Sequence, residues 1–241
     1  MSAKMKKFNF TKLSEKLPST VPFVGPETQE RLNNRLFAAR LGANENVFGP
    51  SPLAIRAMKK EAEKIWMYGD PENHDLKLQL AKKHAVQSEN IVVGEGIDGL
   101  LGYLCRLFIE PGDRVVSSLG AYPTFNFHVA GYGGQLDTVP YVNDYEDPES
   151  LVEKARETNA KLCYLANPDN PMGTWNSGKK IENVGTNIPE GYLFVLDEAY
   201  VEFAPSGTSP KIDCSNEKVI RFRTFSKAYG MAGARVGYAL C

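Results

Sequence analysis

The stretch KVIRFRTFSKAYGMAGARVGYAL, residues 218–240, places a polar segment between two apolar ones. KVIRF and VGYAL have the short, continuous apolar pattern of strands buried on both faces. Between them lie Thr224, Ser226 and Arg235, whose hydroxyl and guanidinium groups are the usual partners of a phosphate. Most lysines are solvated, but partial burial of Lys227 beside Arg235 would lower the pKa of its amine and make it a nucleophile.

The same strand pattern recurs along the chain, separated by segments long enough for helices. We predict seven strands, at residues 91–93, 114–118, 135–140, 161–166, 192–196, 218–222 and 236–240. Ser51-Pro52 predicts the start of a helix, and a second helix is expected from about Asp75 to Val86. Strand–helix alternation predicts an α/β fold, a three-layer α-β-α arrangement around a mostly parallel seven-stranded sheet. In such sheets, ligands bind at the carboxyl ends of the strands.

The first predicted strand is followed by GEGIDG, residues 94–99, which opens a helix. The amides at this helix start are suited to an anionic phosphate. The string also matches the G-x-G-x-x-G pattern of nicotinamide-dependent enzymes, which require an acid about 20 residues on. The second strand instead ends in Ser117-Ser118-Leu119-Gly120, without an acid. A tight turn that binds nothing is the remaining alternative.

Two further strand ends carry polar residues. The segment YLFVL is followed by Asp197-Glu198-Ala199-Tyr200, which fits a magnesium-binding acid pair, an acid facing a cofactor's ring nitrogen, or a simple strand end. No G-x-x-x-x-G-K-[ST] loop precedes it to support the magnesium alternative. In NPDNPMGT, residues 167–174, two Asn-Pro steps make rigid turns that would fix the direction of Asn170, although a plain loop has the same composition.

Composition excludes several classes of function. The 241 residues hold 28 Lys and Arg against 29 Asp and Glu, a net charge of -1, so no nucleic-acid partner is predicted. The four cysteines lack C-x-x-C spacing and histidines are scarce, so neither a metal site nor a disulfide framework is expected. MSAKMKKFNF at the N-terminus lacks the apolar segment of a secretory signal, and no apolar run approaches the roughly 18–20 residues that span a membrane. The sequence indicates a cytoplasmic protein without a membrane partner, in which His74, His84 and His128 are structural.

Taken together, these motifs resemble the fold-type I pyridoxal-phosphate aminotransferases, and most closely the histidinol-phosphate aminotransferase subgroup. The matching strings are LGANENVFGPSP, PGDRVV, YPTF, NPDNPMGT, LDEAYVEF and TFSKAYGMAGARVGYA, which follow the family's order from about Leu41 to Cys241. A serine-lysine pair with an arginine eight positions after the lysine, downstream of DEAY, is a specific combination. The resemblance implies pyridoxal 5'-phosphate as the cofactor.

The resemblance also implies a role for each site residue. Lys227 would bind the cofactor covalently and move the substrate proton, and Asp197 would keep the ring nitrogen protonated. Tyr200 and Asn170 would hydrogen-bond the ring's phenolic oxygen. Phe125 would stack on the ring, although the family usually has Tyr at this position, so a hydroxyl contact is lost while stacking persists.

The cofactor's phosphate would be held by amides and side chains drawn from two strand ends, namely Ile97, Asp98, Thr224, Ser226 and Arg235. Tyr68 would reach the phosphate of the neighbouring subunit, which implies a homodimer. Two departures from the family pattern stand out. Ile97-Asp98-Gly99 replaces a small residue followed by Asp-Glu, and Met172 replaces the usual Thr.

By this resemblance the chain is expected to be an aminotransferase of histidine biosynthesis, acting on a histidinol phosphate-like amino donor and a 2-oxoacid such as 2-oxoglutarate. Three alternatives stay open: an aromatic amino-acid aminotransferase, a cofactor-binding fragment without turnover, and a nicotinamide-dependent dehydrogenase. Residues 1–49 are expected to form an N-terminal arm with a portion of the small domain, and residues 50–241 the large cofactor-binding domain. The family's C-terminal small domain, whose arginine grips the substrate carboxylate, is expected to be absent, with little transaminase activity as a result.

Overall fold

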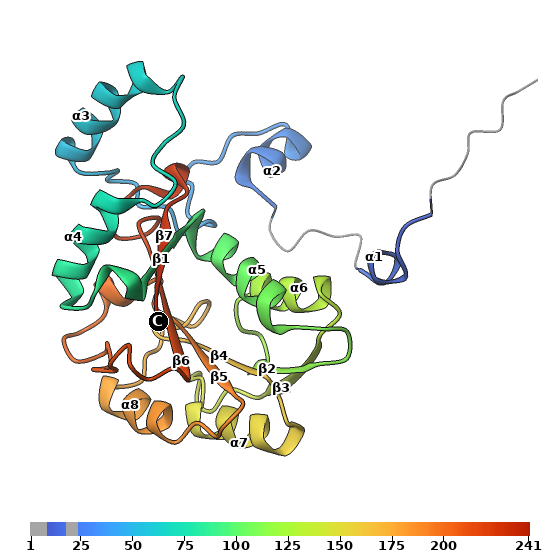
Figure 1. The fold of residues 1–241 in the computed structure, drawn as a ribbon. Coiled ribbons are helices and arrows are strands. Elements are labelled where there is room, and N and C mark those ends of the chain that lie inside the picture. The colour runs from blue at the N-terminus through green and yellow to red at the C-terminus, as the bar shows by residue number, and fades with distance from the viewer. Residues whose placement is uncertain (1–8, 18–23) are drawn as a thin grey trace, which may run out of the picture.

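A seven-stranded sheet forms the centre of the computed structural model, which describes residues 9–17 and 24–241 (Figure 1). Most of MSAKMKKFNF, on which the expectation about a secretory signal rests, therefore lies outside the described residues. The strands are β1 (Ile91–Gly94), β2 (Arg114–Ser118), β3 (Gln135–Val139), β4 (Leu162–Ala166), β5 (Leu193–Asp197), β6 (Val219–Thr224) and β7 (Gly237–Leu240). All seven predicted strands are confirmed.

The sheet has the strand order β1-β7-β6-β5-β4-β2-β3. Strand β7 runs antiparallel to both of its neighbours, β1 and β6, and the remaining pairs are parallel. The prediction of a mostly parallel sheet is therefore confirmed. One detail differs, because β3 is an edge strand whose residues are mostly exposed rather than buried on both faces.

Eight α-helices lie in the described part of the chain. They are α1 (Lys12–Lys16), α2 (Pro26–Asn33), α3 (Pro52–Glu61), α4 (His74–His84), α5 (Gly96–Phe108), α6 (Pro123–Gly131), α7 (Pro148–Thr158) and α8 (Gly178–Thr186). The predicted start of α3 is confirmed: the Ser51 hydroxyl accepts from the Leu53 amide at 3.2 Å, and Pro52 is the first helical residue. No helix among the described residues is long and apolar enough to cross a membrane.

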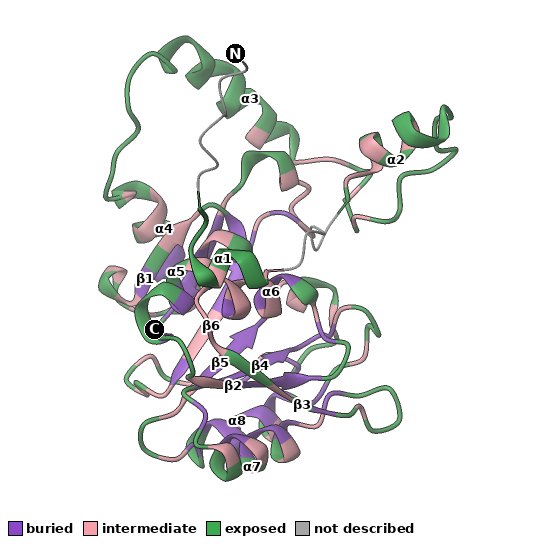
Figure 2. Cartoon of the chain, turned by 90° about the vertical axis from the view of Figure 1, so that its right-hand side faces the viewer, coloured by how far each residue is buried: buried purple, intermediate pink, exposed green. Residues whose placement is uncertain are grey.

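Helices cover both faces of the sheet. Figure 1 shows α7 and α8 against one face and α5 and α6 against the other. Neighbouring residues of one strand alternate between the two cores, so Val115 packs on the α5 side and Val116 on the α7 side. Figure 2 shows burial concentrated in the sheet and in the helix sides that face it, whereas α2 and α3 are largely exposed. This layering leaves the carboxyl ends of β4, β5 and β6 side by side at one edge.

Candidate active site

A cavity of about 590 Å³ lies at the carboxyl ends of these strands. Its wall contains most of the site residues predicted from the sequence: Ile97, Asp98, Asn170, Asp197, Tyr200, Thr224, Ser226, Lys227 and Arg235. The N-terminal arm closes the cavity with residues that include Arg40, Ala43, Asn44 and Glu45. Motifs that lie far apart in the sequence thus share a single concave surface.

Lys227 follows β6 and is half-buried in the cavity wall. Its Nζ donates a hydrogen bond to the carbonyl oxygen of Ala43 at 3.0 Å. Burial lowers the pKa of Lys227, although the carboxylates of Glu45 and Asp197 act in the opposite sense. Lowering the pKa increases the fraction of neutral amine, the form that attacks a carbonyl carbon.

Asp197 ends β5 and is 5% exposed. Its carboxylate accepts from the Tyr164 hydroxyl at 2.8 Å and from the Ala199 amide at 2.9 Å. Burial raises the pKa of Asp197 to about 6. Both hydrogen-bond donors are neutral, and no cation among the described residues forms an ion pair with this carboxylate. The cavity therefore contains a buried acid that lacks a cationic partner.

The Tyr200 hydroxyl is the meeting point of two asparagines. It accepts from Asn170 Nδ2 at 3.4 Å and from Asn44 Nδ2 at 3.1 Å. Burial raises the pKa of Tyr200, so the hydroxyl keeps its proton as a hydrogen-bond donor. The sequence gives no sign of the contact between Asn44 and Tyr200, because 156 residues separate the two.

Two hydroxyls and a guanidinium gather at the other end of the cavity. Thr224 Oγ1 lies 2.9 Å from Ser226 Oγ and accepts from the Ser226 amide at 3.0 Å. Arg235 Nη2 donates to the carbonyl oxygen of Glu95 at 3.2 Å, at the start of α5. Glycine is required at position 96, because φ is +78° there and a Cβ would lie 2.8 Å from Arg235 Nη2. The structure thus brings together the groups that the sequence assigned to a phosphate, and their role stays a prediction.

The sequence did not reveal the carboxylate partner of one histidine. Asp98 Oδ1 lies 2.9 Å from His128 Nε2, so His128 does have a carboxylate partner, and this hydrogen bond lowers the pKa of Asp98. The pair joins α5 to α6, whose positions in the sequence give no sign of the contact. His84 fits the expected structural role, since its Nε2 lies 2.8 Å from the Tyr238 hydroxyl.

Two predicted cofactor residues lie outside the cavity wall. Phe125 is 0% exposed, and its ring stacks on Tyr164 with centroids 4.5 Å apart. In the same YPTF stretch it is Tyr122 that lines the cavity. Tyr68 is fully exposed and away from the cavity, so its predicted role across a dimer interface stays a prediction.

A second buried acid lies behind the turn that carries Asn170. Glu146 is 2% exposed; its Oε2 accepts from the Ser118 hydroxyl at 2.6 Å and its Oε1 from the Ala166 amide at 3.0 Å. Burial and the adjacent carboxyl of Asp169, itself 4% exposed, raise the pKa of Glu146 to about 8. Near neutral pH, Glu146 is therefore a neutral acid.

This pair gives a pH-dependent prediction. Because the pKa of Glu146 is raised by folding, its contribution to stability is complete below about pH 4.5 and is lost as pH rises through about 8. Glu146→Gln keeps a neutral donor at every pH. We expect this variant to raise the free energy of unfolding by roughly 1–3 kcal/mol at about pH 9 and to change it little at about pH 5. Urea unfolding at both values measures the difference.

Glu149→Gln is the matched control, because Glu149 is an exposed surface carboxylate that pairs with Lys180 at 2.9 Å. It should leave the pH dependence as in the wild type. A stability loss for Glu146→Gln at about pH 9 would show that folding does not raise the pKa of Glu146.

The seven-stranded sheet and the lysine-centred cavity at its carboxyl edge are those of the aminotransferase class I and II family, to which the chain belongs: the family's sequence model matches residues 39–241. Among similar proteins are histidinol-phosphate aminotransferases. That of Moorella thermoacetica is 33% identical over 236 residues, 95% of this chain and 61% of the relative. Histidinol-phosphate aminotransferase 2 of Carboxydothermus hydrogenoformans is 35% identical over 233 residues, which are 94% of this chain and 64% of the relative.

One solved structure has a higher sequence identity than these two relatives and also matches the fold of this chain. The crystal structure of histidinol-phosphate aminotransferase from Sinorhizobium meliloti in complex with pyridoxal-5'-phosphate is 53% identical and superposes with a TM-score of 0.92. The match covers 98% of this chain and 64% of that one. The chain thus spans 61–64% of the length of these three proteins.

Proposed function

We propose that the protein is a pyridoxal-phosphate-dependent aminotransferase, which moves an amino group between a histidinol phosphate-like donor and a 2-oxoacid such as 2-oxoglutarate. The observation that carries the proposal is that Lys227, Asp197 and the hydroxyl–arginine group face one cavity. The names of the relatives and the cofactor of the Sinorhizobium meliloti enzyme support it. A role in histidine biosynthesis, a cytoplasmic location, homodimer formation and the division into residues 1–49 and 50–241 belong to the same proposal.

The residues present fit this cofactor at both of its ends. Thr224, Ser226 and Arg235 offer donors and a positive charge to a phosphate, with the first amides of α5 beside them. Asp197 has two neutral donors and no ion pair among the described residues, so a protonated ring nitrogen would supply a cationic partner. When bound, pyridoxal phosphate supplies an aldehyde that condenses with amines and a ring that withdraws electrons from the substrate's α-carbon.

The chain's own residues then have separate tasks. Asp197, as a buried carboxylate, holds a proton at the ring nitrogen. Lys227 Nζ lies in the cavity wall, and the lowered pKa of its amine favours the neutral form that takes up a proton and returns it. The Tyr200 hydroxyl and the Asn170 amide hydrogen-bond the ring oxygen and orient the ring.

The other enzyme classes are less well supported. A nicotinamide-dependent dehydrogenase needs the GEGIDG turn for its own pyrophosphate, but here Arg235 occupies the space above Gly96. An aromatic amino-acid aminotransferase would use the same cofactor-binding residues. Only the substrates therefore distinguish it from the proposed enzyme. Single-turnover amino transfer from histidinol phosphate and from phenylalanine, compared on the cofactor-loaded protein, measures that difference.

Cofactor capture tests the proposal most directly. Purified protein is mixed with pyridoxal phosphate, reduced with borohydride, digested and analysed by mass spectrometry. We expect a visible absorbance band before reduction and a cofactor-modified peptide that contains Lys227 afterwards. Parallel titration with NADH addresses the dehydrogenase alternative. Absence of the modified peptide together with NADH binding would reject the aminotransferase.

A further inference from the structure

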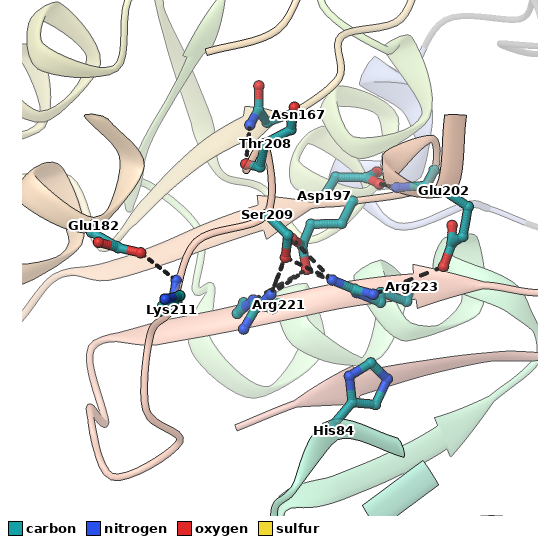
Figure 3. A network of polar contacts seen from close by, with 12 residues as sticks. His84, Asn167, Glu182, Asp197, Glu202, Thr208, Ser209, Lys211, Arg221 and Arg223 are labelled. Carbon is teal, nitrogen blue, oxygen red and sulfur yellow. Dashed lines mark hydrogen bonds and ion pairs between the residues drawn. The ribbon is translucent and has the colours of Figure 1, made fainter. Parts of the chain in front are cut away.

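A cluster of buried charged side chains lies beside strand β6, where Arg221 and Arg223 contact Ser209 (Figure 3). Successive side chains of an extended strand point to opposite faces, so Asp197 faces the cavity and Glu198, 0% exposed, points away from it. Arg221 and Arg223 flank Phe222, whose ring belongs to the core on the cavity side. Both guanidiniums therefore lie on the same side of the sheet as Glu198.

Four side chains make up this charge cluster: Glu198, Arg221, Arg223 and Ser209. Glu198 Oε2 accepts from Arg221 Nε at 3.1 Å and from Arg223 Nε at 3.0 Å, and Oε1 accepts from the Ser209 hydroxyl at 2.9 Å. Both arginines also donate to Ser209 Oγ at 2.8 Å. Burial alone would raise the pKa of Glu198, but the two arginines outweigh it and the pKa lies below its usual value. Glu198 is therefore ionised near neutral pH.

The charge cluster joins the two strands that supply the cofactor residues. Strand β5 pairs with β6 in a register that sets Asp197 opposite Phe222, and the Glu198 amide donates to the Phe222 carbonyl at 2.9 Å. Arg223 directly precedes Thr224, which belongs to the phosphate-binding group. The ion pairs of Glu198 thus fix the end of β5 against the end of β6.

Ser209 extends the connection to a third segment. The preceding residue, Thr208, accepts at its carbonyl from Asn167 Nδ2 at 3.3 Å, and Asn167 begins the turn that carries Asn170. The loop packs closely on the start of α8, where a Cβ on Gly178 would lie 2.6 Å from the Ser209 carbonyl oxygen. Displacing Ser209 would therefore displace the Asn170 turn as well.

Stability alone does not account for such a cluster. A buried ion pair contributes little net stability compared with apolar residues of similar volume, whereas the loss of one partner leaves an uncompensated charge. What a multiply hydrogen-bonded cluster does provide is a fixed geometry. Two members of the cluster are next to cofactor residues in the sequence: Glu198 follows Asp197, and Arg223 precedes Thr224.

We propose that Glu198, Arg221, Arg223 and Ser209 act as positioning residues, which together hold Asp197, Thr224 and Asn170 in the mutual arrangement that receives the cofactor. The inference rests on the proposed function, since it concerns how this chain holds pyridoxal phosphate. Removing one member should weaken cofactor binding without removing any group that touches the cofactor.

The experiment compares Arg221→Met and Ser209→Ala with the wild type. Three quantities are measured: the dissociation constant of pyridoxal phosphate, the pH midpoint of the bound cofactor's absorbance, and the urea midpoint of the cofactor-free protein. We expect the dissociation constant to rise roughly 2- to 30-fold, the range for loss of a supporting contact, and the absorbance midpoint to move by about half a pH unit or more. Arg221→Lys, which keeps the charge, should recover part of both effects.

Arg114→Met is the matched control, because Arg114, the first residue of β2, pairs with Asp137 of β3, and neither residue lines the cavity. It should lower stability and leave cofactor binding and the absorbance midpoint unchanged. If Arg221→Met and Ser209→Ala behave like this control, the cluster is only structural and the positioning role is overturned. A wild-type protein that does not bind pyridoxal phosphate overturns the proposed function as well, so the two failures are distinguishable.

Discussion

Lys227→Ala is expected to abolish borohydride-stable attachment of pyridoxal phosphate. Among the described residues, Lys227 is the lysine that lines the cavity, and its amine is half-buried with a lowered pKa. Without that amine no group at this position can bond to the cofactor's aldehyde carbon. Weak, reversible binding should persist, because Thr224, Ser226 and Arg235 still offer their donors to the phosphate. Mass spectrometry after reduction measures the attachment, and equilibrium dialysis measures the reversible binding.

Two comparisons make this result specific. Lys180→Ala removes a surface lysine that pairs with Glu149 at 2.9 Å, and it should leave attachment at the wild-type level. Lys227→Arg preserves a positive charge but supplies no nucleophilic amine, so it should fail in the same way as alanine. Full attachment in Lys227→Ala, mapped to another lysine, would show that Lys227 is not the cofactor lysine.

Asp197→Asn is expected to change cofactor binding and stability in opposite directions. The carboxylate is the buried charge that would face the ring nitrogen, and losing one partner of such a pair costs about 2–4 kcal/mol, or roughly 30- to 1000-fold in affinity. In the cofactor-free protein the same buried charge lowers the stability of the fold. Folding raises the pKa of Asp197 to about 6, so its contribution to stability is complete below about pH 3.8 and is lost as pH rises through about 6.

Removing the charge should therefore stabilise the cofactor-free protein by about 1–3 kcal/mol at about pH 8, with little change at about pH 4. Fluorescence titration with pyridoxal phosphate gives the affinity, and urea unfolding at both pH values gives the stability. Asp113→Asn is the control, because Asp113 pairs with Lys161 at 2.6 Å away from the cavity and should lose stability instead. Unchanged affinity in Asp197→Asn would place the ring nitrogen's partner elsewhere.

Local sequence patterns predicted much of the fold. Continuous apolar runs locate all seven strands, because a strand covered by helices on both faces has no polar side to interrupt the run. Ser51-Pro52 locates the start of α3, since the cap forms within one turn of helix. The burial of strand β3 was not predicted correctly. Strand β3 lies at the edge of the sheet and is mostly exposed, and the sequence of a single strand does not reveal its position in the sheet.

The location of the candidate site residues was also predictable where these residues follow the end of a strand. Lys227 and Asp197 follow directly from strands whose carboxyl ends meet, and the structure places both in the cavity wall. Stacking was harder to predict. Phe125 and Tyr122 lie three residues apart in one stretch, and it is Tyr122 that lines the cavity while Phe125 packs on Tyr164.

The sequence by itself thus determined the α/β class and the strands, because these depend on periodicity, and it supplied candidate residues for amino-group chemistry through side-chain identity and family resemblance. Tertiary structure alone decided which distant groups surround them. Asn44 reaches Tyr200, His128 reaches Asp98, and Glu198 gathers its arginines on the far face of the sheet. Such contacts depend on how strands are ordered and how segments more than twenty residues apart pack, and burial then sets the charge states of Asp197 and Glu146 that no local pattern contains.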